Sequence, residues 1–152
     1  MSVLEIKKAG DPILRQIAEP VAKIDRKIKK ILDEMTETMY QAEGIGLAAP
    51  QVGISLRIVV IDVGQELIEL INPVIIEADG SATEPEGCLS VPGMYGEVER
   101  CTSVIVEGLN RTGKKVRISA SGLLARALQH EIDHLNGVLF IDRAKTIYKG
   151  QS

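Results

Sequence analysis

The stretch that decides the fold is His130-Glu131-Ile132-Asp133-His134, which holds both histidines of this 152-residue chain. Residues four apart lie on the same face of a helix, so His130 and His134 can bind one metal ion. Glu131 lies between them, close enough to accept a proton from a metal-bound water. A hydrolytic metal site also needs a third protein ligand and an open coordination position. Because the chain has no third histidine, that ligand must be a cysteine or a carboxylate.

The surrounding sequence predicts a helix over residues 121–136, followed by Gly137 as the residue that ends it. Apolar residues at helical spacing form its core stripe: Leu124, Leu128 and Leu135. Leu123 and Ala127 share the opposite face with the two histidines. That face should therefore line the site.

The rest of the chain predicts two helices followed by a β-rich middle. The expected helices cover residues 11–18, after an Asp-Pro start, and 25–42. Residues 44–53 should be irregular or briefly extended. The expected strands cover residues 58–63, 67–76 with a break at 72–73, 98–109, 115–118 and 138–141, with a hairpin turn at 110–113 and a polar tail at the end. We therefore expect an α+β fold, with antiparallel or mixed strands packed around a central metal-bearing helix, in a single catalytic domain over residues 1–152.

Two cysteines compete for the third ligand position. Cys88 follows Gly87, which permits an unusual backbone approach, and a thiolate is a strong ligand for zinc or ferrous iron. Cys101 has a plainer setting within a strand-like segment, typical of a core or half-buried thiol. The residues by themselves favour Cys88 and leave Cys101 open.

A glycine-rich run at residues 44–49 superficially matches a dinucleotide-binding loop. Such a loop needs a strand before it and a helix after it, whereas here a helix precedes and Pro50 follows. Small residues in this run instead let a backbone approach a ligand closely. Gln51 would then offer a side-chain amide to an oxyanion, unless it is an ordinary polar loop residue.

Composition excludes several other classes of function. The net charge of −3 gives no sign of nucleic-acid binding, and no apolar run approaches the roughly 20 residues of a membrane span. The first ten residues lack the apolar core of a signal peptide. We expect a cytoplasmic protein in which both cysteines remain thiols.

Three segments in register resemble peptide deformylase. They read Gly44-Ile45-Gly46-Leu47-Ala48-Ala49-Pro50-Gln51, Glu86-Gly87-Cys88-Leu89-Ser90 and Gln129-His130-Glu131-Ile132-Asp133-His134. The opening Asp11-Pro12-Ile13-Leu14-Arg15 matches as well, so the resemblance covers nearly the whole chain.

This resemblance implies a hydrolase that removes the N-formyl group from N-formyl-methionyl nascent peptides and releases formate. It implies Cys88 as the third ligand and one Fe(II) per chain, which zinc or nickel can replace. Glu131 would be the general base, and Gln51 and the Leu89 N–H would be the oxyanion donors. Transient contact with the ribosome is a further expectation.

The resemblance also implies substrate contacts. The backbone at Gly44 and Gly46 would hold the peptide as an added strand, and three side chains would line the methionine pocket: Ile45, Leu123 and Ala127. Tyr95 departs from the family pattern, in which some members carry an arginine near the substrate.

Four charged residues near the site have expected partners. Glu43 and Arg100 match a family ion pair, and Glu86 and Asp133 are candidates for orienting the histidines.

Two alternatives remain at this point. A metallopeptidase with the same histidine motif would cleave internal peptide bonds, and a structural metal module would catalyse nothing. Comparison of a formylated peptide with its unformylated twin distinguishes all three.

Overall fold

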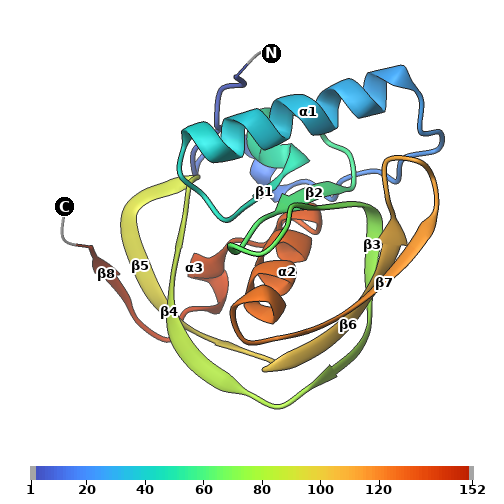
Figure 1. The fold of residues 1–152 in the computed structure, drawn as a ribbon. Coiled ribbons are helices and arrows are strands. Elements are labelled where there is room, and N and C mark those ends of the chain that lie inside the picture. Colours follow the sequence, from blue (N-terminus) through green and yellow to red (C-terminus); the bar gives the residue numbers. More distant parts are fainter. Residues whose placement is uncertain (1–2, 151–152) are drawn as a thin grey trace.

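The computed structural model describes residues 3–150 and places one helix, α2, at the centre of two antiparallel sheets (Figure 1). The helices are α1 (Arg26–Gln41), α2 (Gly122–Leu135) and α3 (Phe140–Arg143), with two 3₁₀ turns, η1 (Pro12–Arg15) and η2 (Ala49–Val52). The expected α+β architecture around a central helix is confirmed. No helix within residues 3–150 is both long and apolar enough to cross a membrane.

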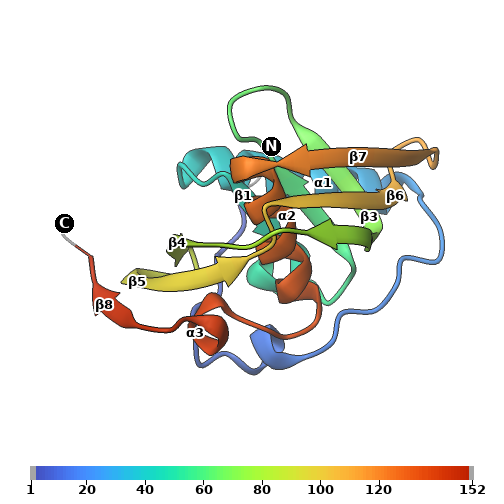
Figure 2. The ribbon, with the colours of Figure 1, turned by 90° about the horizontal axis from the view of Figure 1, so that it is seen from below.

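The larger sheet has five strands in the order β1-β2-β3-β6-β7. Its strands are β1 (Gly46–Ala48), β2 (Ile58–Ile61), β3 (Ile68–Asp79), β6 (Ser103–Leu109) and β7 (Lys115–Ser121). The smaller sheet has the order β4-β5-β8, with β4 (Ala82–Cys88), β5 (Val91–Arg100) and β8 (Ile147–Lys149). Seen from below, strands of both sheets pass across α2 (Figure 2). Strand β1 forms one edge of the larger sheet, and β4 forms one edge of the smaller sheet.

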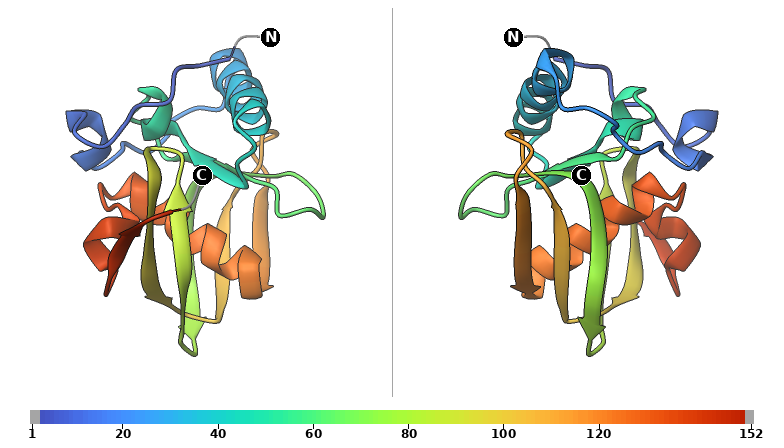
Figure 3. Two further views of the ribbon diagram at one scale, coloured as in Figure 1. Left: turned by 90° about the vertical axis from the view of Figure 1, so that its left-hand side faces the viewer. Right: turned by 90° about the vertical axis from the view of Figure 1, so that its right-hand side faces the viewer.

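Strand β2 is buried on both faces because a helix covers each of them. Its alternate residues Val59 and Ile61 pack in the cluster around α2, while Ile58 and Val60 pack in the cluster around α1. Figure 3 shows α1 and α2 on opposite sides of this part of the sheet. An uninterrupted β-branched run is the pattern expected of a strand with no solvent face.

The sequence located both long helices to within about a residue. Asp25 caps α1 by accepting a hydrogen bond from the backbone N–H of Ile28 at 3.1 Å. The expected stripe of α2 is confirmed, since Leu128 and Leu135 are fully buried and Leu124 packs against the same cluster. Gly137 follows the helix with a φ of +75°, as a C-terminal glycine should.

The first expected helix is shorter than residues 11–18. Asp11 caps it as expected, through a hydrogen bond from the Ile13 N–H, but the 3₁₀ turn ends at Arg15. The chain then becomes extended, because the N–H of Ala18 donates to the Leu135 carbonyl at the end of α2. A contact distant in sequence thus replaces the local helical hydrogen bond.

Two expectations for the β-rich part were wrong, and two strands were missed. The segment 98–109 is not one strand, because the chain leaves β5 at Arg100 and enters β6, in the other sheet, at Ser103. Strand β4 was not expected, nor was the short strand β8 in the polar tail. Residues 138–141 are not a strand, since Asp142 accepts a hydrogen bond from the Leu139 N–H and so starts α3.

The expected segment 67–76 corresponds to one longer strand, β3 (Ile68–Asp79), and the expected break at 72–73 is a bulge within it. Asn72 has a φ of +54°, and the register shifts between Ile71 and Val74. The Asn72 amide accepts a hydrogen bond from the Val21 N–H at 2.8 Å and donates one to the Val21 carbonyl at 3.0 Å. A single side chain therefore joins the N-terminal segment to the sheet.

Asn72→Ala should lower the free energy of unfolding by about 2–4 kcal/mol. Two hydrogen bonds worth about 1 kcal/mol each are lost. A left-handed conformation costs an alanine roughly 1–2 kcal/mol more. Urea unfolding measures the change, and Asn72→Gly is the control that loses only the hydrogen bonds. A loss below about 0.5 kcal/mol for Asn72→Ala, the range of an ordinary surface substitution, would contradict this account.

Candidate metal centre and active site

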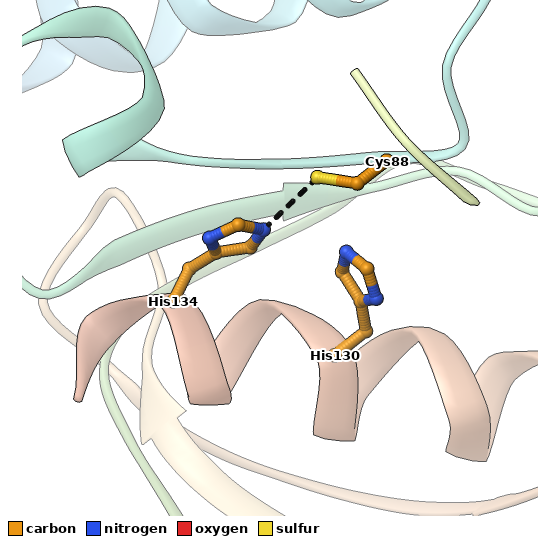
Figure 4. Close-up of side chains that lie close together, drawn as sticks. All are labelled: Cys88, His130 and His134. Atoms are coloured by element: carbon orange, nitrogen blue, oxygen red, sulfur yellow. Dashed lines mark hydrogen bonds between the residues drawn. The ribbon is translucent and has the colours of Figure 1, made fainter. Parts of the chain in front are cut away.

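Three ligand-type side chains converge between β4 and α2. Cys88 ends β4, His130 and His134 lie one turn apart on α2, and one ligand atom from each falls within 4.8 Å of the others (Figure 4). The Cys88 Sγ lies 3.3 Å from the His134 Nε2. A thiolate with two imidazoles fits a zinc-like or ferrous ion, and three protein ligands leave a position open.

Cys101, the other candidate, lies away from this cluster. Its backbone N–H donates to the Gln129 side chain at 3.0 Å, and its carbonyl accepts from the same amide at 2.9 Å. Its side chain packs against the apolar cluster around α2. Cys101 thus behaves as the half-buried structural thiol that its setting in the sequence indicated.

A cavity of about 460 Å³ opens beside the three ligands. It lies between the two sheet edges, since both β1 and β4 contribute to its walls. Nearly all the site residues expected from the sequence line it: Gly44, Ile45, Gly46, Gln51, Cys88, Leu89, Leu123, Ala127, His130 and Glu131. Ile45 and Leu123 are largely exposed at its mouth, while Ala127 is buried.

Glu131 is a buried carboxylate at the wall of this cavity. It is 4% exposed, and within residues 3–150 its Oε1 has no hydrogen-bond partner. Burial raises its pKa to about 7, near the value that suits a proton acceptor at neutral pH. A Cβ at Gly46 would come within 2.5 Å of the Glu131 Oε2. Gly46 must therefore be glycine so that β1 can lie against this carboxylate.

Gln51 presents its amide nitrogen to the cysteine. Its Oε1 accepts from the Ala48 N–H at 2.9 Å, which fixes the orientation of the amide. Its Nε2 then donates to the Ser90 hydroxyl at 3.1 Å and lies 3.6 Å from the Cys88 Sγ. With an exposure of 1%, Gln51 is no ordinary polar loop residue.

Gly87 permits a close approach, as the sequence indicated, but the group that approaches is Tyr95. A Cβ at position 87 would lie 2.8 Å from the Tyr95 ring. Tyr95 also lines the cavity and stacks on Tyr148 of β8, with ring centroids 6.3 Å apart. An aromatic ring thus stands at the side of the cavity near Cys88.

Glu86 orients His130. Its Oε1 lies 3.0 Å from the His130 Nδ1, and Arg100 donates to both of its oxygens, at 2.7 and 3.0 Å. Burial alone would raise the pKa of this carboxyl, but the hydrogen bonds from His130 and Arg100 outweigh it and lower the pKa to about 2. The carboxylate stays ionised and holds Nδ1, which leaves Nε2 free to face the ligand cluster.

Two expected partnerships are wrong. Arg100 pairs with Glu86 and Asp133 and is 5% exposed, whereas Glu43 is exposed at the cavity rim. Asp133 orients no histidine, because its carboxylate binds Arg100 and Arg143. Within the described residues, the His134 Nδ1 has no hydrogen-bond partner.

The two histidines have opposite protonation tendencies. Burial opposes a charge on His130, but the Cys88 and Glu86 side chains outweigh it and raise the pKa to about 10. Burial, followed by the charge of His130, lowers the pKa of His134 well below its usual value. A histidine binds a metal ion as the neutral imidazole.

Sequence reasoning missed Arg126 and Ser90. Arg126 is a buried cation on α2 that binds Glu86, and Ser90 positions the Gln51 amide. Arg126 had one available signal, a charged residue next to the apolar face that carries the histidines. For Ser90 the sequence offered no signal of its own, apart from its place at the end of the segment Glu86–Ser90.

Comparison with known proteins agrees with this geometry. The sequence model of the family described as polypeptide deformylase matches residues 3–149. A peptide deformylase of Halothermothrix orenii is 62% identical over 149 residues, covering 97% of each chain, and one of Carboxydothermus hydrogenoformans is 56% identical, covering 98% of each. The crystal structure of peptide deformylase from Thermotoga maritima superposes with a TM-score of 0.94 at 47% identity, covering 96% of this chain and all of that one. A Synechococcus elongatus peptide deformylase, solved in complex with actinonin, gives 0.92 at 48% identity, covering 94% of this chain and 79% of that one.

The family model and the two aligned relatives cover nearly the whole described chain, including the residues of the candidate site. The chain therefore belongs to the polypeptide deformylase family, metal-dependent hydrolases that remove the N-formyl group from nascent polypeptides.

Proposed function

We propose that Cys88, His130 and His134 hold one metal ion, and that this site releases formate from the N-terminal formylmethionine of nascent peptides. The observation that carries the proposal is the approach of the three ligand atoms to within 4.8 Å, beside the buried Glu131. When bound, the ion supplies a Lewis acid and lowers the pKa of a water molecule. Residues 1–152 act as a single catalytic domain.

Glu131 moves the proton in this reaction. Its carboxylate takes a proton from the water that attacks the formyl carbon and gives it to the leaving amine. Support comes from its raised pKa of about 7 and from an Oε1 with no partner within residues 3–150. A general base is most effective when its pKa lies close to the working pH.

Gln51 and the Leu89 N–H stabilise the negative charge that develops on the formyl oxygen. The Gln51 Nε2 already faces the ligand cluster, 3.6 Å from the Cys88 Sγ, and Leu89 lines the same cavity. Donors that are held in place before the reaction need no reorganisation as charge develops.

The peptide binds along the free edge of β1 at Gly46 and along the backbone of Gly44, which lies just before this strand. An edge strand offers unpaired N–H and C=O groups, to which an extended peptide can add as a further strand. The methionine side chain then enters the apolar part of the cavity lined by Ile45, Leu123 and Ala127.

Fe(II) is the proposed working metal, with zinc or nickel as substitutes. The donor set of one thiolate and two imidazoles accepts each of these ions, and the resemblance to the family favours iron. A nascent-chain substrate further implies work in the cytoplasm with transient ribosome contact. The names of the relatives do not favour the metallopeptidase alternative.

Metal-loaded protein should release formate from formyl-Met-Ala-Ser and leave unformylated Met-Ala-Ser intact. The physical reason is that the site aligns the formyl carbon, rather than an internal peptide bond, with Glu131. Formate is measured directly, and peptide fragments are measured by mass spectrometry. Cleavage of either peptide chain would support a peptidase, and absence of any reaction would contradict both activities.

Glu131→Gln should retain the metal and lose a factor of at least about 10²–10⁴ in turnover, the usual contribution of acid–base catalysis. The amide keeps the shape of the side chain but cannot take the proton. Steady-state formate release and metal content are measured on the same sample. Near-normal turnover with full metal content would remove Glu131 from this role.

Cys88→Ala should lose metal during dialysis against a mild chelator, whereas Cys101→Ala should keep it. Both variants remove a partly buried thiol, but only Cys88 lies within reach of the two histidines. Metal content is measured by elemental analysis. Full retention by the Cys88 variant would overturn the ligand assignment.

Gln51→Leu should lower kcat by about 10²–10³-fold, as loss of one oxyanion donor does. The expected effect on KM is small, because the donor acts mainly in the transition state. Initial rates over a range of formyl-Met-Ala-Ser concentrations separate the two constants. A change confined to KM would make Gln51 a ground-state binding residue.

A further inference from the structure

Arg126 is a buried cation for which the reaction above has no use. It belongs to α2, four residues before His130, and is 8% exposed. Arginine is seldom fully buried unless its charge is paired. Its polar contacts therefore need an explanation.

Each polar contact of Arg126 is made to β4 or β5. Its Nη1 donates to the Glu86 Oε2 at 2.6 Å and to the Val98 carbonyl at 2.9 Å. Its Nη2 donates to the Ala82 carbonyl at 2.8 Å, and its Nε lies 3.3 Å from the exposed carboxylate of Glu84. One guanidinium thus joins α2 to both strands of a hairpin.

The same two pieces of chain carry the candidate ligands. Cys88 ends β4, and both histidines lie on α2, so the distance from thiolate to imidazoles depends on how the hairpin packs against the helix. Arg100, on β5, also binds Glu86 and joins β5 to α2 through Asp133, but it makes no contact that ties β4 directly to the helix. Of the two arginines on Glu86, only Arg126 comes from the helix of the histidines.

The contact with Glu86 also affects His130. Arg126 binds the Oε2 of this carboxylate, while His130 Nδ1 lies against its Oε1. Arg100 already binds both oxygens of this carboxylate, and Arg126 adds a donor from the helix that carries His130, so it ties the carboxylate to the imidazole's own element. Arg126 in addition lines the cavity, next to Ala127.

We propose that Arg126 is a positioning residue that holds the strand of Cys88 and, through Glu86, the ring of His130 at the distance and orientation that metal binding requires. The proposal rests on the metal site proposed above, and its effect is on metal affinity before any substrate is present.

Arg126→Met tests the proposal, because it keeps the stem and removes the guanidinium. The Co(II) dissociation constant is measured by competition with a chelator, together with the near-ultraviolet charge-transfer band from thiolate to cobalt. We expect the dissociation constant to rise about 10–100-fold, as for loss of other groups that hold metal ligands. The charge-transfer band should weaken or shift. For formyl-Met-Ala-Ser, kcat should fall with little change in KM.

Two controls remove a charge but leave the buried hydrogen bonds from Arg126 to Glu86, Val98 and Ala82 in place. Arg117→Met removes a surface arginine on β7, and Glu84→Gln removes only the exposed partner of Arg126. Both should bind Co(II) like the unchanged protein. Circular dichroism and thermal unfolding identify any variant that fails to fold.

Arg126→Lys keeps the charge but cannot make all the contacts, so it should show an intermediate affinity, and it provides the test if Arg126→Met does not fold. A folded Arg126→Met protein, or failing that a folded Arg126→Lys protein, with unchanged affinity and band would overturn the proposal. These measurements use no substrate, so failure of the unchanged protein to release formate would refute the proposed function separately.

Discussion

One buried carboxylate joins the parts of the chain on which the candidate site depends. Glu86 of β4 lies two residues before Cys88 and binds His130 and Arg126 of α2, together with Arg100 of β5. Buried charges are tolerated only when they are paired and hydrogen-bonded, and Glu86 has charged or polar partners at both oxygens. The segment Glu86-Gly87-Cys88 therefore provides both the candidate thiolate ligand and the carboxylate that binds His130.

This network of buried charges is stable only when every charge keeps its partner. Removing one partner of a buried ion pair typically costs about 3–5 kcal/mol, because the other charge is left without compensation. The chain of contacts continues from Arg100 to Asp133 and from there to Arg143 on α3. A change at any of these positions should therefore affect the candidate ligand cluster, to which the network is connected through the contact of Glu86 with His130. Preorganisation of the ligands is the benefit that a catalytic metal site gains from such a network.

The sequence predicted the central part of this structure because that part follows local rules. The spacing of His130 and His134, the apolar stripe of α2 and the caps at Asp25 and Gly137 depend on residues within one or two helical turns. The choice of Cys88 over Cys101 was favoured by Gly87 but was decided only by the resemblance, and the proposal of Cys88 as a ligand is supported by its 4.8 Å cluster with the two histidines. Each of these features can be argued without knowing the rest of the chain.

What the sequence did not predict depends on contacts between distant segments. No glycine or proline marks the crossing between the sheets at residues 100–103, so local turn signals could not divide β5 from β6. The partners of Arg100 and Asp133 differ from those expected, because charge pairing is decided by the packing of β5 and α3 on α2. Arg126 was missed for the same reason, since its role depends on β4 and β5 lying beside the helix.

The most direct test of the account is a crystal structure of anaerobically prepared, metal-loaded protein, with diffraction recorded at the iron absorption edge. The account predicts one anomalous peak per chain, about 2.3 Å from the Cys88 Sγ and about 2.0–2.1 Å from a ring nitrogen of His130 and of His134, the distances usual for such ligands. Glu131 should lie beside the peak without binding it. A peak elsewhere, or bound to Cys101 or to the Glu131 carboxylate, would contradict the account.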